Sequence, residues 1–479
     1  MTAKPAHEAT SSSVSAPHEG ELKRNLKNRH IQMIALGGAI GTGLFYGAGS
    51  SIGMAGPSII AAYLVGGAAI FLIMRALGEM SVHTPVAGAF SHYAAKNWGK
   101  FAGFFTGWNY WFCYIAVSMA ELSVVGIYIN YWLPGIPTWV SAGVFLVIIT
   151  AINLINVKAY GEFEFWFAII KVVAIVAMIV FGLAMAIFGL GLDAPTGISN
   201  LWAHGGFLPN GLWGMLTALV LVMFSFGGVE LIGITAGEAD NPARSIPKAI
   251  NQVVYRILIF YVGAIFVLLA LFPWNKVGQD GSPFVIIFDR IGIVGAATIL
   301  NVVVLTAALS AYNSGLYSNG RMLYSLAKQG QAPKVLARTS ASGSPYAGVL
   351  ASSAVTAIAV VLNYVAPKQV FMVLMSIATI AAILNWAVVL ITQLKFRRRI
   401  GAEAADRLSF KMPLFPVANY VVLAFLAFVV FLMTTMDGMR EAVFIGAGWI
   451  VALYIAFRVV SAARRTTAVD EQKVPTTIG

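Results

Sequence analysis

A series of long apolar segments constrains this chain more than any other feature. Each segment has about 20 residues, the length that an α-helix needs to cross the hydrocarbon core of a bilayer. Of all residues, 59% are hydrophobic and only 10% are charged, whereas a soluble domain has about 25% charged residues. We therefore expect an all-α integral membrane protein. Its twelve predicted transmembrane helices cover residues 31–54, 57–81, 101–131, 138–157, 163–190, 210–237, 249–273, 292–326, 347–365, 370–395, 414–436 and 441–462.

The basic residues indicate how these helices are oriented. If the N-terminus is cytoplasmic, 25 of the 31 lysines and arginines fall on the cytoplasmic side, four on the opposite side and two within helices. The positive-inside rule favours this arrangement, and anionic lipid explains the net charge of +12 without a nucleic-acid partner. We expect a location in the cytoplasmic (inner) membrane, with a disordered basic tail at 1–29 and a second tail at 463–479, both cytoplasmic. Residues 1–20 contain no apolar core, so we expect no cleavable signal peptide.

The first predicted helix contains an interruption. Four of the eleven residues from Ala35 to Phe45 are glycine, and each glycine inside a helix costs about 1 kcal/mol relative to alanine. Unwound backbone is tolerated within a bilayer only where protein buries it or where it lines a cavity. We therefore predict a broken helix that restarts near Thr42 and turns its positive end toward a binding site for an anionic group. Alternatively, the small residues mark a close contact between two helices.

The sixth predicted helix contains a second interruption, in the stretch Met223–Glu230, where Gly227 and Gly228 precede a carboxylate. The first helix runs outward and the sixth inward. Two interrupted helices of opposite direction are typical of inverted repeats with a central site between them. We therefore predict a five-plus-five inverted repeat with broken helices 1 and 6. The two repeats cover residues 31–190 and 210–395, and the two extra helices lie at 414–462.

Ionisable residues inside a membrane are costly and are functional candidates by default. Lys171 follows Glu162 by nine residues in the fifth helix, which places it about 13 Å into the membrane by helical rise. A lysine at this depth is difficult to keep solvated, and its charge can depend on its surroundings. We interpret Lys171 as a proton-coupling residue. The alternative is a structural lysine bonded to backbone carbonyls that the first break exposes.

Three carboxylates complete the set of candidate charged residues. Glu230 follows the second break, and we predict a titrating or gating role for it. Glu121 lies in the outer part of the third helix, where a static hydrogen bond is as good an interpretation as a role in coupling. Glu79 follows Arg75 by four residues near the cytoplasmic end of the second helix. That spacing predicts a local ion pair between them.

Other function classes lack the residues they need. Cys113 is the only cysteine and the six histidines are scattered without ligand spacing, so we expect no metal site and no cofactor. The sequence has no Ser/His/Asp, HExxH or Walker-type constellation, so we expect neither an enzyme nor an ATPase subunit. An ion channel is disfavoured because no ring of charges and no repeated filter sequence is present.

The sequence resembles the amino acid–polyamine–organocation superfamily and, within it, the bacterial amino acid transporter family. The resemblance covers about residues 20–460 and rests on Gly37–Phe45, Phe224–Glu230 and Glu238–Pro242, which occur in the family's order and spacing. The stretches most similar to aromatic amino acid and phenylalanine permeases, with histidine and proline permeases close behind, are Arg29–Gly38, Phe165–Val172 and Leu305–Ser314.

This resemblance implies a transporter domain at residues 30–462 that imports an amino acid by proton symport. The alternatives within the same fold are a histidine or proline permease, or an amino acid exchanger without net proton coupling. By position, the amides of Thr42 and Gly43 would hold the substrate carboxylate, and Phe224 would close over the substrate. Lys171 would be the coupling lysine. The carbonyls expected to hold the substrate ammonium belong to Ala39, Phe224 and Phe226. The full set of expected substrate-binding residues is Ala39, Ile40, Gly41, Thr42, Gly43, Tyr110, Phe224, Ser225, Phe226, Gly227 and Gly228. The expected coupling or gating residues are Lys171, Glu230 and Glu121.

The residues around the two breaks also favour one class of substrate. Helix ends of opposite polarity suit a zwitterion, and Gly227 with Gly228 leaves room for a bulky side chain. Aromatic pairs add about 0.5–1.5 kcal/mol beyond simple burial. The residues that offer rings are Phe224, Phe226, Tyr110, Trp111, Tyr114, Tyr312 and Tyr317, although most aromatic residues of a membrane protein only pack or lie at its interfaces. We therefore predict phenylalanine, tyrosine and tryptophan as substrates, with histidine as the nearest rival.

Overall fold

The computed structural model describes residues 33, 40–86, 88–155, 157–190, 192, 194–235, 241–277, 282–290, 294–367 and 369–472. In these residues all regular secondary structure is helical. The α-helices are α2 (Thr42–Phe45), α3 (Gly47–Ala55), α4 (Ile59–His83), α5 (Ala89–Asn97), α6 (Lys100–Asn130), α7 (Thr138–Ile155), α8 (Val157–Phe188), α9 (Gly211–Ser225), α10 (Leu231–Thr235), α11 (Pro242–Arg256), α12 (Ala264–Leu271), α13 (Pro283–Arg290), α14 (Val294–Lys328), α15 (Tyr346–Thr356), α16 (Ile358–Val365), α17 (Val370–Ile400), α18 (Ala402–Asp406), α19 (Val417–Thr434) and α20 (Arg440–Gln472).

The prediction of an all-helical membrane protein is confirmed. Within the described ranges, ten helical stretches are long and apolar enough to cross a membrane, and α9 is a shorter apolar helix. The bounds differ from the prediction at several places, of which the following are examples. Helix α20 continues to Gln472 instead of ending at 462, because no glycine or proline interrupts it there. The short helices α5 and α13 were not predicted, and α11 begins at Pro242, ahead of residue 249, because Pro fits the first turn of a helix.

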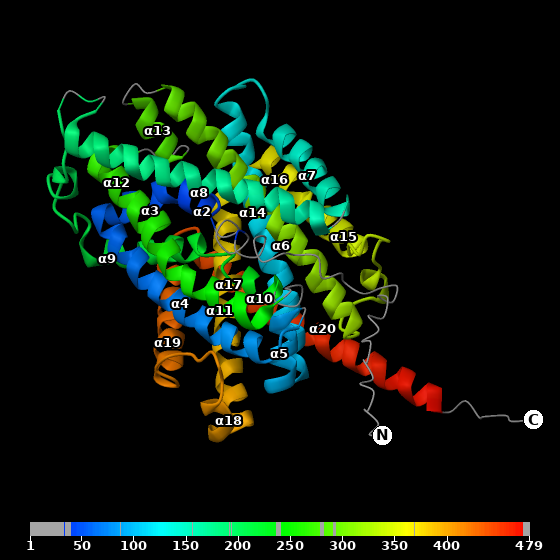
Figure 1. Cartoon of the computed structure of the whole chain (residues 1–479). Coiled ribbons are helices and arrows are strands. Elements are labelled where there is room, and N and C mark those ends of the chain that lie inside the picture. Colours follow the sequence, from blue (N-terminus) through cyan, green and yellow to red (C-terminus); the bar gives the residue numbers. More distant parts are fainter. Residues whose placement is uncertain are drawn as a thin grey trace, which may run out of the picture.

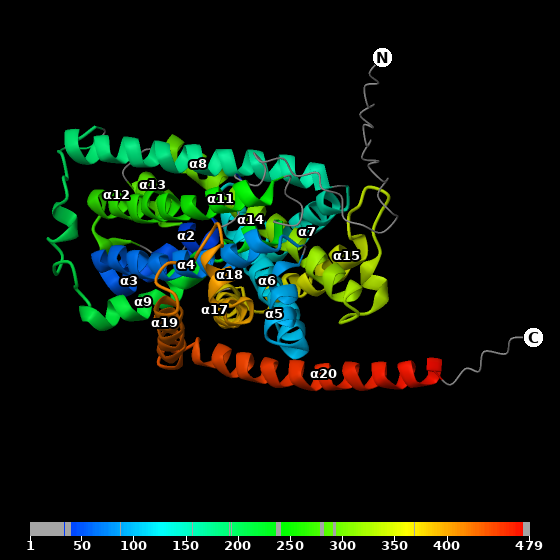
Figure 2. The same cartoon turned by 60° about the horizontal axis from the view of Figure 1, so that its bottom comes forward.

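The helices differ strongly in how deeply they are buried. In their most apolar stretches, 78% of the residues of α6 and of α17 are buried, compared with 11% for α20. Helix α2 lies in the middle of the bundle in both views (Figures 1 and 2). Figure 2 shows α8 along one side of the bundle and α20 along the opposite side. The first break therefore lies in the protein interior, whereas α8 and α20 present large faces to the surroundings.

Helix α8 shows how a peripheral helix is divided between lipid and protein. Its exposed large residues include Phe163, Trp166, Ile170, Val173 and Phe181. On the opposite face the buried residues are Glu164, Ala168, Lys171, Ile175 and Met178, at the three- and four-residue spacing of one helix face. The apolar face suits lipid. The two charged residues of the buried face therefore point into the bundle.

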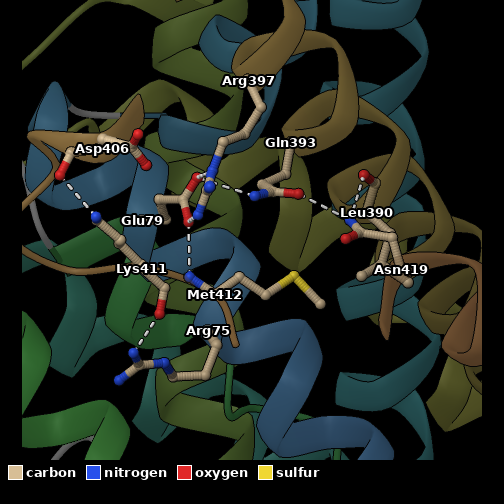
Figure 3. A network of polar contacts seen from close by, with 9 residues as sticks. All are labelled: Arg75, Glu79, Leu390, Gln393, Arg397, Asp406, Lys411, Met412 and Asn419. Atoms are coloured by element: carbon tan, nitrogen blue, oxygen red, sulfur yellow. Dashed lines mark hydrogen bonds and ion pairs between the residues drawn. The ribbon is translucent and has the colours of Figure 1, made fainter. Parts of the chain in front are cut away.

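Four hydrogen bonds surround the carboxylate of Glu79 on α4 (Figure 3). Arg397 of α17 donates two of them, at 2.6 and 2.7 Å, Gln393 donates one at 2.9 Å, and the backbone N–H of Met412 donates one at 2.6 Å. The Glu79 side chain is fully buried. This carboxylate thus ties α4 to α17 and to the segment that follows α18.

The predicted ion pair between Arg75 and Glu79 is wrong. Arg75 instead donates to the side chain of Asn251 at 3.2 Å and to the backbone carbonyl of Lys411, and its guanidinium lies 3.8 Å from the centre of the Phe410 ring. A buried carboxylate needs several donors, and the planar fork of an arginine on a facing helix supplies two at once. Spacing within one helix could not reveal this partner on α17.

We expect Glu79→Gln to lower the free energy of unfolding by about 3–5 kcal/mol, because it leaves the largely buried Arg397 without a counter-charge. The measurement is the thermal unfolding of the purified protein in detergent. Glu403→Gln is the matched control, since Glu403 and Arg407 form an exposed pair on the surface, and such pairs contribute little. Equal unfolding temperatures for the two variants would contradict the proposed importance of this carboxylate.

Candidate functional site

The described part of the first break, residues 40 and 41, lies where the sequence predicts it. Ile40 and Gly41 are not helical, and Gly41 has extended backbone (φ −121°, ψ −157°) immediately before α2 begins at Thr42. Only Tyr46 separates α2 from α3, so the chain from Thr42 to Ala55 is nearly continuous helix. The predicted restart near Thr42 is confirmed. Ala39 lies outside the described residues.

The second break follows α9, which ends at Ser225. Residues 226–230 form turns, and α10 begins at Leu231. Gly228 has a φ of +95°, a conformation that glycine adopts without the strain that a side chain would add. Glycine at position 228 is therefore needed for the turn, and the predicted interruption of this helix is confirmed.

The two breaks are in direct contact. A Cβ atom added to Gly43 would lie 2.6 Å from Cα of Ser225 and 3.2 Å from the ring of Phe224. Two tyrosines hold Ser225 in place. The hydroxyl of Tyr261 donates to the Ser225 carbonyl at 2.9 Å, and the hydroxyls of Tyr63 and Ser225 share a hydrogen bond of 3.4 Å. Only glycine at position 43 permits this approach of the two backbones.

A small cavity lies between the breaks. Its volume is about 30 Å³, whereas pockets that hold small ligands measure about 300–1,000 Å³. The site is therefore nearly closed in this conformation. The residues that line it are Gly41, Gly43, Cys113, Tyr114, Val117, Glu121, Phe224, Ser225, Gly227, Gly228, Glu230, Ala311, Ala378 and Ala382.

Several predicted site residues lie beside this cavity without lining it. The fully buried ring of Tyr110 packs between Phe90, at 4.9 Å, and Tyr114, at 4.7 Å between ring centres. The ring of Phe226 packs against Tyr63 and Tyr261. Phe224 does line the cavity, with its ring edge-on to Phe371 at 6.2 Å. Of the predicted aromatic residues, the structure thus brings Phe224 and Tyr114 to the cavity.

Glu121 of α6 reaches the first break. One of its carboxylate oxygens accepts the N–H of Thr42 at 3.4 Å, and the same oxygen would lie 2.7 Å from a Cβ atom on Gly41. Its other oxygen is buried and has no hydrogen-bond partner in the described part of the chain. The carboxylate of Glu121 therefore accepts the hydrogen bond from the Thr42 amide. The family resemblance assigns this amide to the substrate carboxylate.

Glu230 lies at the second break and also borders the cavity. The hydroxyl of Tyr114 donates to its carboxylate at 3.0 Å. Glu230 is 4% exposed, so its charge is removed from water. The two carboxylates that border the cavity thus come from different elements, one at each break.

Lys171 lies behind the first break and is fully buried. Its ammonium donates to the carbonyl of Ile40 at 3.3 Å and to the hydroxyl of Ser310 at 2.8 Å. It also lies 3.9 Å from a carboxylate oxygen of Glu164. The contact with Ile40 is the one that the structural interpretation of this lysine requires.

Sequence reasoning missed Glu164 and Ser310. Both are fully buried, and the Ser310 hydroxyl donates to Glu164 at 2.5 Å. One signal was available, because Glu164 precedes Lys171 by seven residues and therefore shares its helix face. No pattern in the sequence points to Ser310, because its place beside Lys171 and Glu164 depends on how α14 packs against α8. Among the described residues, no group of three or more His, Cys, Asp or Glu side chains is placed to hold a metal ion.

These features define a class: a helical multi-pass membrane protein in which two interrupted helices meet at a buried polar site. The sequence model of the amino acid permease family matches residues 30–472. The chain belongs to this family, and the predicted family resemblance is confirmed. The family and the relatives described next are transporters, not enzymes.

Several relatives match nearly the whole chain. It is 54% identical over 440 residues to the aromatic amino acid transport protein AroP of Escherichia coli (strain K12), which covers 92% of this chain and 96% of that protein. It is 53% identical over 443 residues to AroP of Salmonella typhimurium, with 92% and 96% covered. A third relative is the "Uncharacterized amino acid permease YtnA" of Bacillus subtilis (strain 168), 52% identical over 438 residues, with 91% and 95% covered.

Proposed function

We propose that this protein is a proton-coupled symporter that imports amino acids, with aromatic side chains preferred, across the cytoplasmic membrane. The observation that carries the proposal is the contact between the two breaks, where Gly43 lies against Ser225 beside the amide of Thr42. We further propose that residues 31–190 and 210–395 form inverted repeats around this site. Both chain ends are cytoplasmic in this proposal, as the distribution of basic residues requires.

In the proposed binding mode, the amides of Thr42 and Gly43 hold the substrate carboxylate, and the carbonyls of Ala39, Phe224 and Phe226 hold its ammonium. The substrate then competes with Glu121, which accepts the Thr42 amide in this conformation. Two charged carboxylates cannot share one donor without strong repulsion. Substrate binding therefore requires that Glu121 takes up a proton or moves away, and in the first case it links the substrate to a proton.

Two observations support an aromatic substrate. The relatives from Escherichia coli and Salmonella typhimurium carry the name aromatic amino acid transport protein. The cavity is bordered by the rings of Phe224 and Tyr114 and by the small residues Gly227, Ala311 and Ala378. When the site opens, small residues leave space for a ring and the two aromatic residues offer faces to it.

A competition screen tests the substrate. Uptake of labelled phenylalanine is measured in the presence of each of the twenty amino acids in excess. We expect phenylalanine, tyrosine and tryptophan to compete most strongly, with histidine next. Stronger competition by proline, lysine or glycine than by every ringed amino acid would contradict the proposed specificity and leave the transporter class intact.

We expect Gly227→Met to penalise tryptophan uptake more than phenylalanine uptake, by about tenfold, because the added side chain takes up the space beside the ring. Among the described residues, a Cβ atom on Gly227 would meet only the carbonyl of Phe224, at 3.2 Å, so a small shift accommodates it. The measurement is the ratio of tryptophan to phenylalanine uptake. An equal loss of both substrates would show that Gly227 serves only the helix break.

A further inference from the structure

Three buried side chains form a chain of hydrogen bonds between α8 and α14. Lys171 donates to the hydroxyl of Ser310 at 2.8 Å, and that hydroxyl donates to a carboxylate oxygen of Glu164 at 2.5 Å. All three residues are fully buried. A serine hydroxyl donates one hydrogen bond while it accepts another, so Ser310 can join a donor to an acceptor. The short distance to Glu164 is typical of a hydroxyl bonded to a charged carboxylate.

The position of Glu164 distinguishes it from the other carboxylate near Lys171. Within the described part of the chain, the charged groups near Lys171 include Glu164 of its own helix, Glu121 of α6 and Arg256 at the end of α11. Glu121 borders the cavity and bonds to Thr42, whereas Glu164 does not line the cavity. Of these two carboxylates, Glu121 thus borders the cavity, whereas Glu164 is bonded to Ser310 of α14.

Further buried hydroxyl groups follow Ser310 and Glu164 along α14 and α8, and together with them form a row that we call the polar line. Ser314 and Ser318 follow Ser310 at intervals of four residues on α14, so all three share one helix face, and all are buried. On α8, Tyr160 precedes Glu164 by four residues, and its hydroxyl shares a 3.2 Å hydrogen bond with Ser314. The second oxygen of Glu164 is buried and has no hydrogen-bond partner in the part of the chain that the structure describes. This polar line runs toward the ends of α8 and α14 that we place in the cytoplasm.

We propose that Glu164 is the acceptor that receives the coupling proton from Lys171 through Ser310 and passes it toward the cytoplasm. This inference rests on the proposed proton coupling. In the step, the hydroxyl proton of Ser310 moves to Glu164 while a proton of the Lys171 ammonium moves to the Ser310 oxygen. The products are a neutral amine and a neutral carboxylic acid, and Ser310 is unchanged. Because an ion pair becomes a neutral pair, no net charge is created in the buried interior, where an unpaired charge is costly.

The transport test uses the full chain in proteoliposomes with two readouts. One is the accumulation of labelled phenylalanine driven by an imposed pH gradient, and the other is exchange with phenylalanine on both sides and no gradient. We expect Glu164→Gln and Ser310→Ala to lower accumulation at least about tenfold and to retain exchange. Ser310→Thr, which keeps the hydroxyl, retains accumulation. Glu162→Gln is the matched control, because it makes the same chemical change two residues away, and it retains both activities.

Two transport results would overturn the proposal. One is accumulation by Glu164→Gln with the pH profile of the wild type, and the other is an equal loss of accumulation and exchange, which indicates a structural role. If the wild type itself fails to accumulate phenylalanine on a pH gradient but exchanges it, the proposed proton coupling fails. Failure of the proposed proton coupling is therefore distinguished from failure of the proposed role of Glu164, because the first is seen in the wild type and the second only in the variants.

Infrared difference spectra of the purified protein, recorded between low and high pH, test the acceptor without any transport. We expect a band from a protonated buried carboxyl group in the wild type and in Glu162→Gln. Because Glu121 and Glu230 are buried carboxylates as well, we expect Glu164→Gln to lose one component of the carboxyl bands and not all of them. The same component is expected to be shifted in Ser310→Ala, since Ser310 is hydrogen-bonded to the carboxyl group of Glu164. A spectrum of Glu164→Gln that matches the wild type would overturn the assignment of Glu164 as the proton acceptor.

Discussion

Replacing Gly43 by leucine is expected to reduce phenylalanine uptake about a hundredfold, to background, while the protein still inserts into the membrane. The reason is steric. A Cβ atom alone would lie 2.6 Å from the Cα atom of Ser225 and 3.0 Å from its hydroxyl, and leucine adds three further carbon atoms. The two broken helices then cannot approach each other, so the groups that would hold the substrate separate. The measurement is uptake per molecule of inserted protein.

The control for this variant is another glycine in a helix. For Gly448 on α20, no described atom outside the adjacent backbone of its own helix lies within 4 Å of an added Cβ, so Gly448→Leu tests the same substitution without the collision. We expect it to retain uptake. A correctly inserted Gly43→Leu protein with normal affinity for phenylalanine would contradict the placement of the site between the two breaks.

Lys171→Ala is expected to abolish proton-driven accumulation, a loss of about two orders of magnitude. The substitution removes the donor to Ile40 and to Ser310 and leaves Glu164 buried without its cation. Accumulation is measured in proteoliposomes over a range of external pH. We expect the pH dependence of the wild type to disappear in the variant.

This variant also risks unfolding, because removal of one partner of a buried ion pair costs about 3–5 kcal/mol. The double variant Lys171→Met with Glu164→Gln removes both charges and keeps much of the volume, so it separates coupling from folding. We expect the double variant to be folded and to lack pH-driven accumulation. If either variant concentrates phenylalanine against its gradient with an unchanged pH profile, Lys171 has only the structural role that its bond to Ile40 supports.

The helices and their breaks could be predicted because both follow from local chemistry. Apolar length sets the spans, and clustered glycines set the interruptions that end at Gly41, before α2, and at Gly227–Gly228. The deep position of Lys171 followed in the same way from helical rise.

Contacts between distant elements could not be predicted in this way. Glu79 pairs with Arg397, more than three hundred residues away, although Arg75 is its neighbour on the same helix. Tyr110 and Tyr114 are both buried on α6, and only packing decides that Tyr114 lines the cavity. The hydrogen bonds that join Lys171 to Glu164 pass through Ser310 of α14. Residue spacing within α8 cannot reveal this serine. A single sequence specifies which face of a helix is buried, whereas the partner on the facing helix depends on the assembled bundle.

The accumulation of labelled phenylalanine in proteoliposomes that contain the wild-type protein tests the proposed function most directly. An inward proton gradient is imposed and the internal concentration is followed over time. We expect it to rise above the external concentration and to fall back when a protonophore dissipates the gradient. If phenylalanine only equilibrates across the membrane, with the same time course with and without the gradient, proton-coupled uptake is contradicted and the protein is an exchanger or a facilitator.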